Sequence, residues 1–293
     1  MSVAATAEGL RTRLREERTR TAGEPTKLAF VDFHIHTRFS RDSILTEEKF
    51  IEKAIERGLT HVVITNHNNI EGGIAVRDKV AELGLTDRLT VILGEEVSTA
   101  DGEVVGVYLE KTIPRGLSAN ETADEIHRQG GLVSIPHPFD PFRGSHIKEG
   151  PLRNLAETKK IDMIEVFNCR VTFQRHNDEA AEFARRHEIP GIAASDSHSS
   201  FEVAMAYNAM PAFDDVEGLR ASLLANEWHA SRSSVFIHAT TRWAVWKNAF
   251  DGWRGKRTAT GPILGPQKPE EVRKEPIQRP TSEQLPAKDK ADE

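Results

Sequence analysis

The sequence has little cysteine, since Cys169 is the single thiol among 293 residues. One thiol excludes an internal disulfide, so the chain makes no demand for an oxidising compartment. It also lacks long apolar stretches. None approaches the roughly 20 residues that a membrane span needs, and the N-terminal region has no apolar signal segment. We therefore expect a cytoplasmic protein that does not associate with membranes.

An excess of basic residues is also absent. The chain has 39 lysines and arginines against 45 aspartates and glutamates, which gives a net charge of −6. No overall positive field exists that would hold duplex nucleic acid through its phosphates. We therefore expect no stable binding of duplex nucleic acid, whereas a nucleotide or a short oligonucleotide is compatible with this charge. The sequence gives no indication of the oligomeric state.

The two ends of the chain differ in composition from the middle. Residues 1–26 are polar and charged, and we expect a flexible arm there. Residues 257–293 are rich in proline and charge and contain no aromatic residue, so they cannot bury enough apolar surface to offset their ordering entropy. We predict a disordered tail there and one folded domain over 27–256. That domain would end in a helix with an aromatic face formed by Trp243, Trp246, Phe250 and Trp253.

Short apolar runs alternate with helical patterns through this domain. The runs cover residues 28–33, 61–65, 89–93, 104–109, 132–135, 161–167 and 190–194. Their nearly continuous aliphatic and β-branched residues are typical of strands buried on both faces. Thr46 and Ser118 are placed to cap two of the intervening helices, and Pro190 closes another over residues 174–188. The repetition predicts an α/β fold with a parallel sheet, either open or closed as a barrel.

Residues of metal-ligand type gather at the carboxyl ends of these runs. They are His34, His36, His67, His137, His198, Asp42, Glu96 and Asp196. In a parallel barrel all these ends lie on one face, where barrel active sites are built, whereas an open sheet would spread them along an edge. One site that draws on so many strands therefore favours a barrel. Eight ligands exceed the need of one ion and indicate two or three divalent ions, with Zn²⁺, Mn²⁺ or Fe²⁺ suited to nitrogen and oxygen ligands.

At these residues the chain resembles the polymerase and histidinol phosphatase (PHP) family of metal-dependent phosphoesterases. The resemblance covers about residues 28–210 and follows the family's order. Its segments are DFHIHTRFSRDS, ITNHNNIEG, LGEEVST followed by GEVVGVYL, SIPHPFD, IEVFNCR and ASDSHS. The resemblance implies a distorted (β/α)7 barrel, similar to a TIM barrel, with a trinuclear metal site.

The resemblance also implies an assignment of ligands to three ions. The first ion would be bound by His34, His36, Glu96 and Asp196, the second by Glu96 and His137, and the third by Asp42, His67 and His198. Alignment with the family favours Glu96 over its neighbour Glu95.

Two positions depart from the family pattern. Asn66 stands where relatives often have aspartate, and Glu103 lies near the place where some have a further histidine. Glu103 is therefore a possible metal ligand, or else the second ion binds more weakly in this protein.

The expected reaction is hydrolysis of a phosphoester by a metal-activated water, with a phosphorylated small molecule or nucleotide as substrate. Asp196 and His198 are the expected catalytic residues, which would handle the proton of the water or of the leaving group. Arg143 and Arg170 follow ligand-bearing strands and are candidate phosphate-binding residues, although surface salt bridges are an equally ordinary use of arginine. The sequence has no nucleophile elbow and no phosphate-binding loop motif.

Three other functions are compatible with the sequence. One is a 5′-end exonuclease for short oligonucleotides. Another is a metal-dependent amidohydrolase, although no lysine ends a run where those enzymes usually need one. The third is a non-catalytic binding module on an inherited barrel. We expect Cys169 to be a buried small residue and the remaining histidines to be structural or exposed, namely His61, His127, His146, His176, His187, His229 and His238.

Overall fold

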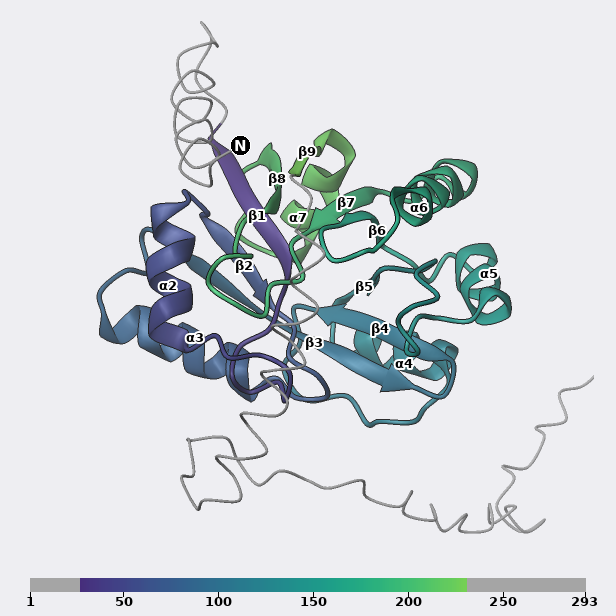
Figure 1. Cartoon of the computed structure of the whole chain (residues 1–293), viewed down its shortest axis with the longest axis horizontal. Coiled ribbons are helices and arrows are strands. Elements are labelled where there is room, and N and C mark those ends of the chain that lie inside the picture. Colours follow the sequence, from purple (N-terminus) through teal and green to yellow (C-terminus); the bar gives the residue numbers. More distant parts are fainter. Residues whose placement is uncertain (1–26, 231–293) are drawn as a thin grey trace, which may run out of the picture. The chain divides into compact units, whose positions relative to one another are not determined.

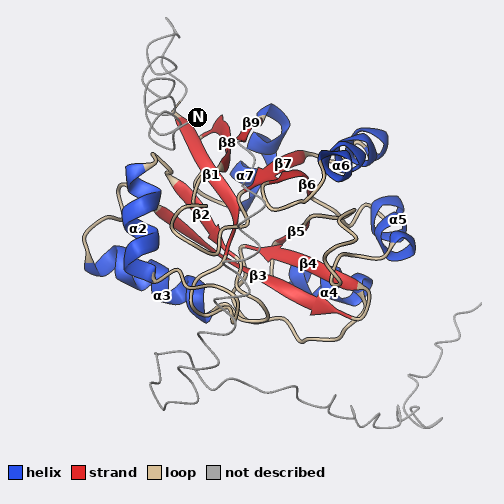
Figure 2. Cartoon of the chain, in the orientation of Figure 1, coloured by secondary structure: helices blue, strands red, loops and turns tan. Residues whose placement is uncertain are grey.

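The computed structural model describes residues 27–230, so the predicted arm, tail and aromatic helix lie outside the described residues. The described chain is a mixed α/β fold around one sheet (Figures 1 and 2). The strands are β1 (Leu28–Ile35), β2 (His61–Ile64), β3 (Thr90–Thr99), β4 (Gly102–Val107), β5 (Leu132–Ile135), β6 (Met163–Asn168), β7 (Gly191–Ala194), β8 (Ala206–Pro211) and β9 (Glu227–Ala230). The helices are α2 (Glu47–Glu56), α3 (Glu71–Glu82), α4 (Ala119–Arg128), α5 (Glu149–Glu157), α6 (Gln174–His187), α7 (Val216–Ser222) and the 3₁₀ helix η1 (Leu223–Ala225). In this part of the chain no helix is both long and apolar enough to cross a membrane.

The nine strands follow the order β7-β6-β5-β4-β3-β2-β1-β8-β9. Strands β1, β2 and β3 are parallel, as are β5, β6 and β7. The two ends of this series meet where Ile35, the last residue of β1, bridges Ser197 just after β7. There the backbone N–H of His36 donates to the carbonyl of Ser197 at 2.9 Å. The sheet is therefore nearly closed and barrel-like, with the carboxyl ends of both parallel groups on one side.

The prediction of unbroken strand-then-helix units is wrong at β3 and β4. The two strands form a hairpin, and β4 runs antiparallel to both β3 and β5. Gly102 makes the tight return possible, because its φ is +127° and a Cβ there would lie 2.4 Å from Ile147 Cα. Strands β8 and β9 were also not predicted. The α/β class and a barrel-like sheet are thus confirmed, while the distorted (β/α)7 barrel that the resemblance implies is not confirmed in its count of units.

Local signals in the sequence set the ends of several helices. Thr46 accepts a hydrogen bond from the backbone of Lys49 and caps α2, and Ser118 forms a capping box with Glu121 at the start of α4. Helix α2 buries Phe50 and Ile51 against the sheet. In Figure 1, α2 and α3 cover the strands near β2 and β3, whereas α4, α5 and α6 lie beside β4 to β6. Helices therefore shield the outside of the sheet and leave the carboxyl ends of the strands to polar residues.

Asn208 of β8 also connects β1 to β7, through hydrogen bonds to the backbone of both strands. Its side chain is fully buried. The Nδ2 group donates to the carbonyls of Val31 (3.1 Å) and Ala193 (2.7 Å), while Oδ1 accepts from the backbone of Ala193 (3.0 Å). One amide side chain thus joins β1 and β7 at a point where the two strands do not pair with each other directly.

We expect Asn208→Ala to lower the free energy of unfolding by about 3 kcal/mol, because each buried backbone group left without a partner costs about 1–3 kcal/mol. Urea unfolding followed by circular dichroism measures this difference. Asn154→Ala is the matched control, since Asn154 lies exposed on α5 and its loss should change stability by less than about 0.5 kcal/mol. Equal stability of the two variants would contradict the role of Asn208 in closure.

Candidate metal centre

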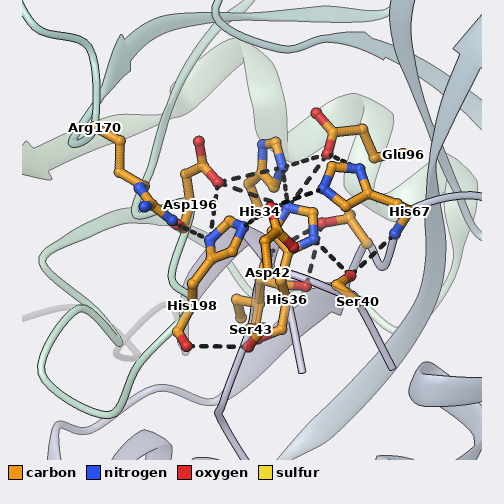
Figure 3. A network of polar contacts seen from close by, with 12 residues as sticks. His34, His36, Ser40, Asp42, Ser43, His67, Glu96, Arg170, Asp196 and His198 are labelled. Carbon is orange, nitrogen blue, oxygen red and sulfur yellow. Dashed lines mark hydrogen bonds and ion pairs between the residues drawn. The ribbon is translucent and has the colours of Figure 1, made fainter. Parts of the chain in front are cut away.

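Two histidines at the end of β1 begin the site (Figure 3). His34 and His36 are two residues apart on an extended segment, so both side chains point to the same side. Their Nε2 atoms lie 2.9 Å apart, and both side chains are fully buried. The sequence predicted this shared orientation.

Each of these imidazoles is held through its other nitrogen. His34 Nδ1 lies 2.6 Å from Glu165 Oε1, and an ionised carboxylate only accepts, so Nδ1 carries a hydrogen. His36 Nδ1 lies 3.0 Å from Ser40 Oγ, which itself donates to Asn66 Oδ1 at 2.8 Å. Ser40 therefore accepts from His36, because its one hydrogen is already used. Both Nε2 atoms are left to face the centre of the site, as metal ligands require.

Glu96 lies within β3 rather than after it, because β3 is longer than the predicted run. Its Oε2 is 3.5 Å from His34 Nε2, 3.3 Å from His36 Nε2 and 3.0 Å from His67 Nδ1. Glu95 points to the opposite face of the strand, where it accepts from the backbone of Ile113 at 2.9 Å. Burial raises the pKa of Glu95 to about 8. The structure thus places Glu96, not Glu95, among the imidazoles.

Asp196 follows β7 and divides its two oxygens between different partners. Its Oδ1 lies 3.8 Å from His34 Nε2 and 3.6 Å from His36 Nε2. Its Oδ2 accepts from Asn168 Nδ2 at 3.1 Å and pairs with the guanidinium of Arg143. One oxygen therefore faces the histidine pair, and the other connects the site to a cationic side chain from the loop after β5.

A second group forms around Asp42, from the loop after β1. Its Oδ2 lies 3.4 Å from His67 Nε2 and 3.1 Å from His198 Nε2. His198 Nδ1 donates to the carbonyl of Asp196 at 2.9 Å, which directs Nε2 towards Asp42. One carboxylate and two imidazoles from three separate loops are thus brought together.

His137 and Glu103 approach Glu96 from another side. His137 Nε2 is 3.2 Å from Glu96 Oε1 and 3.9 Å from Glu103 Oε2. Glu103 reaches this place because β4 is antiparallel, so that the amino end of β4 lies at the carboxyl ends of its neighbours. Burial, followed by the nearby charge of Glu96, raises the pKa of Glu103.

The donor set fits divalent cations. Within the described residues four overlapping groups of ligand atoms lie within 4.8 Å of one another. The groups are His36, Asp42, His67 and His198; His34, His137 and Asp196; His34, His36 and Glu96; and His67, Glu96 and Glu103. Among the carboxylates of these groups, Asp42, Glu96 and Asp196 each have one buried oxygen without a hydrogen-bond partner. Buried carboxylates of this kind are stabilised by cations, and imidazole with carboxylate suits Zn²⁺, Mn²⁺ or Fe²⁺.

The electrostatics of the histidine pair support the same conclusion. Burial disfavours protonation of His34, but the carboxylates of Asp196, Glu165 and Glu96 outweigh it and hold the pKa of His34 well above its ordinary value. Burial and the nearby imidazoles of His198 and His67 lower the pKa of His36 to about 3. The pKa values of these two adjacent imidazoles are thus shifted in opposite directions. The surrounding carboxylates favour positive charge, and the crowded rings together provide only part of it.

The two candidate phosphate-binding arginines differ in their surroundings. Arg143 is 21% exposed and lies at the edge of the site. Arg170 is buried, with Nε 3.5 Å from Glu202 Oε1 and a guanidinium nitrogen 3.5 Å from the carbonyl of Asp196. Cys169 is buried, as expected. Arg143 is therefore the one of these three side chains that lies where a phosphate could reach it, because Arg170 and Cys169 are buried.

Sequence reasoning missed the residues that support the ligands. Glu165, Ser40 and Asn168 are buried and hydrogen-bonded to ligand residues, yet none was singled out. Glu165 and Asn168 lie in the segment IEVFNCR, where a charged residue inside an otherwise buried strand was the available signal.

Comparisons with known proteins agree with this geometry. Residues 32–161 match the PHP domain, and residues 174–227 match a PHP-associated domain. An uncharacterized protein of Methanocaldococcus jannaschii is 34% identical over 148 residues, which is 47% of this chain and 81% of that protein. A second uncharacterized protein of the same organism is 32% identical over 178 residues, or 60% of this chain and 68% of the relative.

A solved structure shares the fold. It is a two-domain protein from Bacteroides vulgatus that contains a predicted PHP-like metal-dependent phosphoesterase. The TM-score is 0.58 at 19% sequence identity, and the match covers 70% of this chain and 65% of the other. This likeness shows a shared fold. The domain matches and the two relatives show that the chain belongs to the PHP domain family of metal-dependent phosphoesterases, which are hydrolases.

Proposed function

We propose that the protein hydrolyses a phosphomonoester, of a small molecule or a nucleotide, at a centre of two or three divalent ions. The observation that carries this proposal is the convergence of five imidazoles and three carboxylates with buried, unpartnered oxygens. Within this proposal β1 to β7 form the distorted (β/α)7 barrel that the family resemblance implies, and β8 and β9 are additions to it.

The proposed ligands fall into three sets, and Glu96 is shared by the first two. The first ion is assigned to His34, His36, Glu96 and Asp196, the second to Glu96, His137 and possible ligand Glu103, and the third to Asp42, His67 and His198. When bound, such ions lower the pKa of water towards about 7 and neutralise charge that develops on phosphate oxygens. The distances between the ligand atoms support this grouping.

The chain's own groups complete the proposed reaction. Asp196 and His198 offer basic atoms beside the centre and are the proposed catalytic residues for the proton of the attacking water or of the leaving group. Arg143 pairs with Asp196 Oδ2, and its Nε lies 4.0 Å from Asp140 Oδ2, so the partly exposed guanidinium stands at the edge of the site, where a phosphate oxygen can also reach it. Arg170, which is buried beneath the Asp196 loop, is proposed to contribute positive charge from within the protein.

We expect Arg143→Ala to lower kcat/KM for phosphate release by about 10²-fold, because a preorganised donor to the transition state is typically worth 10²–10³-fold. Arg143→Lys should recover part of this loss, since it keeps the charge but not the forked geometry. Arg153→Ala is the control, because Arg153 is exposed on α5 and pairs with Glu149. Unchanged kinetics in Arg143→Ala would remove Arg143 from the phosphate site.

An exposed aromatic pair favours the 5′-end exonuclease as a second candidate function. Phe142 and Phe173 are 63% and 44% exposed, and their ring centroids lie 5.5 Å apart. Phe142 adjoins Arg143 in the chain, and the guanidinium of Arg175 lies 4.8 Å from the Phe173 ring centroid. Aromatic rings beside a phosphate-binding arginine are suited to stack the bases of a short single strand.

The experiment that tests the proposal measures the release of inorganic phosphate, and of mononucleotides from the oligonucleotides, with added Mn²⁺ over a panel of substrates. The panel contains nucleoside mono- and bisphosphates, histidinol phosphate, sugar phosphates and 5′-phosphorylated oligonucleotides of two to six residues. Release from small phosphomonoesters supports the phosphatase, whereas a rate that grows with oligonucleotide length supports the exonuclease. No release from any substrate by protein with confirmed metal content would overturn both and favour the amidohydrolase or the non-catalytic binding module.

A further inference from the structure

Glu165 is a buried carboxylate that the assignment of ligands leaves without a role. It lies in β6, is 2% exposed, and belongs to none of the four groups of candidate ligands in the described chain. We propose that Glu165 is a positioning residue of the metal centre, which fixes His34 and His137 by accepting three hydrogen bonds from residues of three strands or strand ends. This inference rests on the proposed metal centre.

Three N–H groups converge on the two carboxylate oxygens. His34 Nδ1 donates to Oε1 at 2.6 Å. The backbone N–H of His137 and the side chain of Asn168 both donate to Oε2, each at 2.8 Å. Because all three hydrogen-bond partners are donors, Glu165 has the surroundings of a fixed acceptor rather than those of a ligand.

Each of these bonds acts on a different part of the centre. The bond to His34 holds the hydrogen on Nδ1 and leaves Nε2 free to bind an ion. The bond to His137 supports a backbone with φ of +27°, a region that residues with side chains rarely adopt. Asn168 in turn donates to Asp196 Oδ2 at 3.1 Å. One carboxylate on β6 thus links ligand residues from β1 and from the loops after β5 and β7.

Glutamine cannot replace Glu165 in this environment, although it has the same shape. If its oxygen accepts from His137 and Asn168, its amide group faces His34 Nδ1, and the imidazole must move its hydrogen to Nε2. If the amide is turned the other way, its N–H groups face the backbone N–H of His137 and the side-chain N–H of Asn168, so that donors face donors. The first orientation loses fewer hydrogen bonds, and it removes the His34 lone pair from the centre.

We test the role with Glu165→Gln by measuring metal affinity directly, without an activity assay. Titration calorimetry with Zn²⁺ and metal analysis after dialysis give the dissociation constant and the number of ions bound. We expect the tightest site to weaken by about 10- to 100-fold, as is typical when the group behind a histidine ligand is lost. In the zinc-loaded wild type, the His34 Nδ1–H should give a far-downfield proton resonance, and this resonance should disappear in Glu165→Gln.

Glu95→Gln is the matched control, because it also replaces a buried carboxylate but on the face of β3 that points away from the ligands. It should bind Zn²⁺ with wild-type affinity. Asn168→Ala is the second variant, for use if Glu165→Gln does not fold. It removes the two hydrogen bonds that Asn168 donates, to Glu165 and to Asp196, and should weaken binding about tenfold, because each bond is worth about 0.5–1 kcal/mol.

The outcomes separate this inference from the proposed function. Wild-type affinity and an unchanged Nδ1–H resonance in Glu165→Gln would overturn the positioning role but leave the metal centre standing. If Glu165→Gln does not fold, wild-type affinity in Asn168→Ala would have the same meaning. No metal binding by the wild-type chain would overturn the metal centre and the role of Glu165 together. Weakened binding in Glu165→Gln with wild-type affinity in Glu95→Gln would establish the role.

Discussion

Asp196→Ala is expected to lower phosphate release by about 10³-fold or more, which corresponds to about 4 kcal/mol of transition-state stabilisation. The reason is that one side chain serves two proposed purposes. Its Oδ1 faces His34 and His36 as a ligand, and its Oδ2 anchors Arg143 at the phosphate side. Removing it weakens the first ion site and releases the arginine at the same time. Phosphate release is measured at saturating Mn²⁺ after the protein has been stripped of metal and reloaded.

The fold is expected to survive this change, and the control must show that it does. Asp196 has a φ of +52°, where alanine is less favourable than aspartate, and its Oδ2 accepts a hydrogen bond from Asn168, so the variant should lose some stability while its apolar core stays unchanged. Asp215→Ala is the matched aspartate control, because Asp215 caps α7 through Gly218 at 2.7 Å, away from the ligand cluster. It should cost about 1 kcal/mol of stability with activity retained. Full activity in stripped and reloaded Asp196→Ala would contradict the assignment of the site.

Much of the fold could be predicted because local signals were sufficient there. The caps at Thr46 and Ser118 are formed by residues within one helical turn, and the buried strands are visible as apolar runs. The antiparallel course of β4 could not be predicted in this way. It depends on Gly102 fitting against Ile147, a residue more than 40 positions away in the chain. A short apolar run such as residues 104–109 does not show the direction in which its strand will run.

The candidate site shows the same division between local and distant information. His34 and His36 could be placed together because the two-residue spacing of a strand fixes their orientation. Glu165 was missed because two of its three donors, the side chain of His34 and the backbone of His137, come from distant parts of the chain. The choice between Glu95 and Glu96 rested on the family resemblance, since both follow the same apolar run. Ligand types can therefore be read from sequence, while the residues that orient them need the structure.

Removal of metal is expected to lower the melting temperature by about 5–10 °C. A ligand present at 100 times its dissociation constant stabilises the folded state by about 2.7 kcal/mol, and in a domain of this size each kcal/mol shifts the melting temperature by about 2–4 °C. The physical cause is the set of buried carboxylate oxygens on Asp42, Glu96 and Asp196, which have no hydrogen-bond partner. Without cations, these groups oppose folding.

Thermal unfolding with Mn²⁺ or Zn²⁺, with a chelator, and with metal added back in excess of the chelator measures this coupling. Asp42→Ala is the informative comparison, because it removes the partner of His67 and His198 while Glu96 and Asp196 remain beside His34 and His36. If the sites are separate, Asp42→Ala should retain part of the metal-dependent shift, whereas Asp196→Ala should lose a different part. A shift of wild-type size in both variants would mean that the stabilising ion binds elsewhere, since a ligand stabilises the folded state only through the site that holds it.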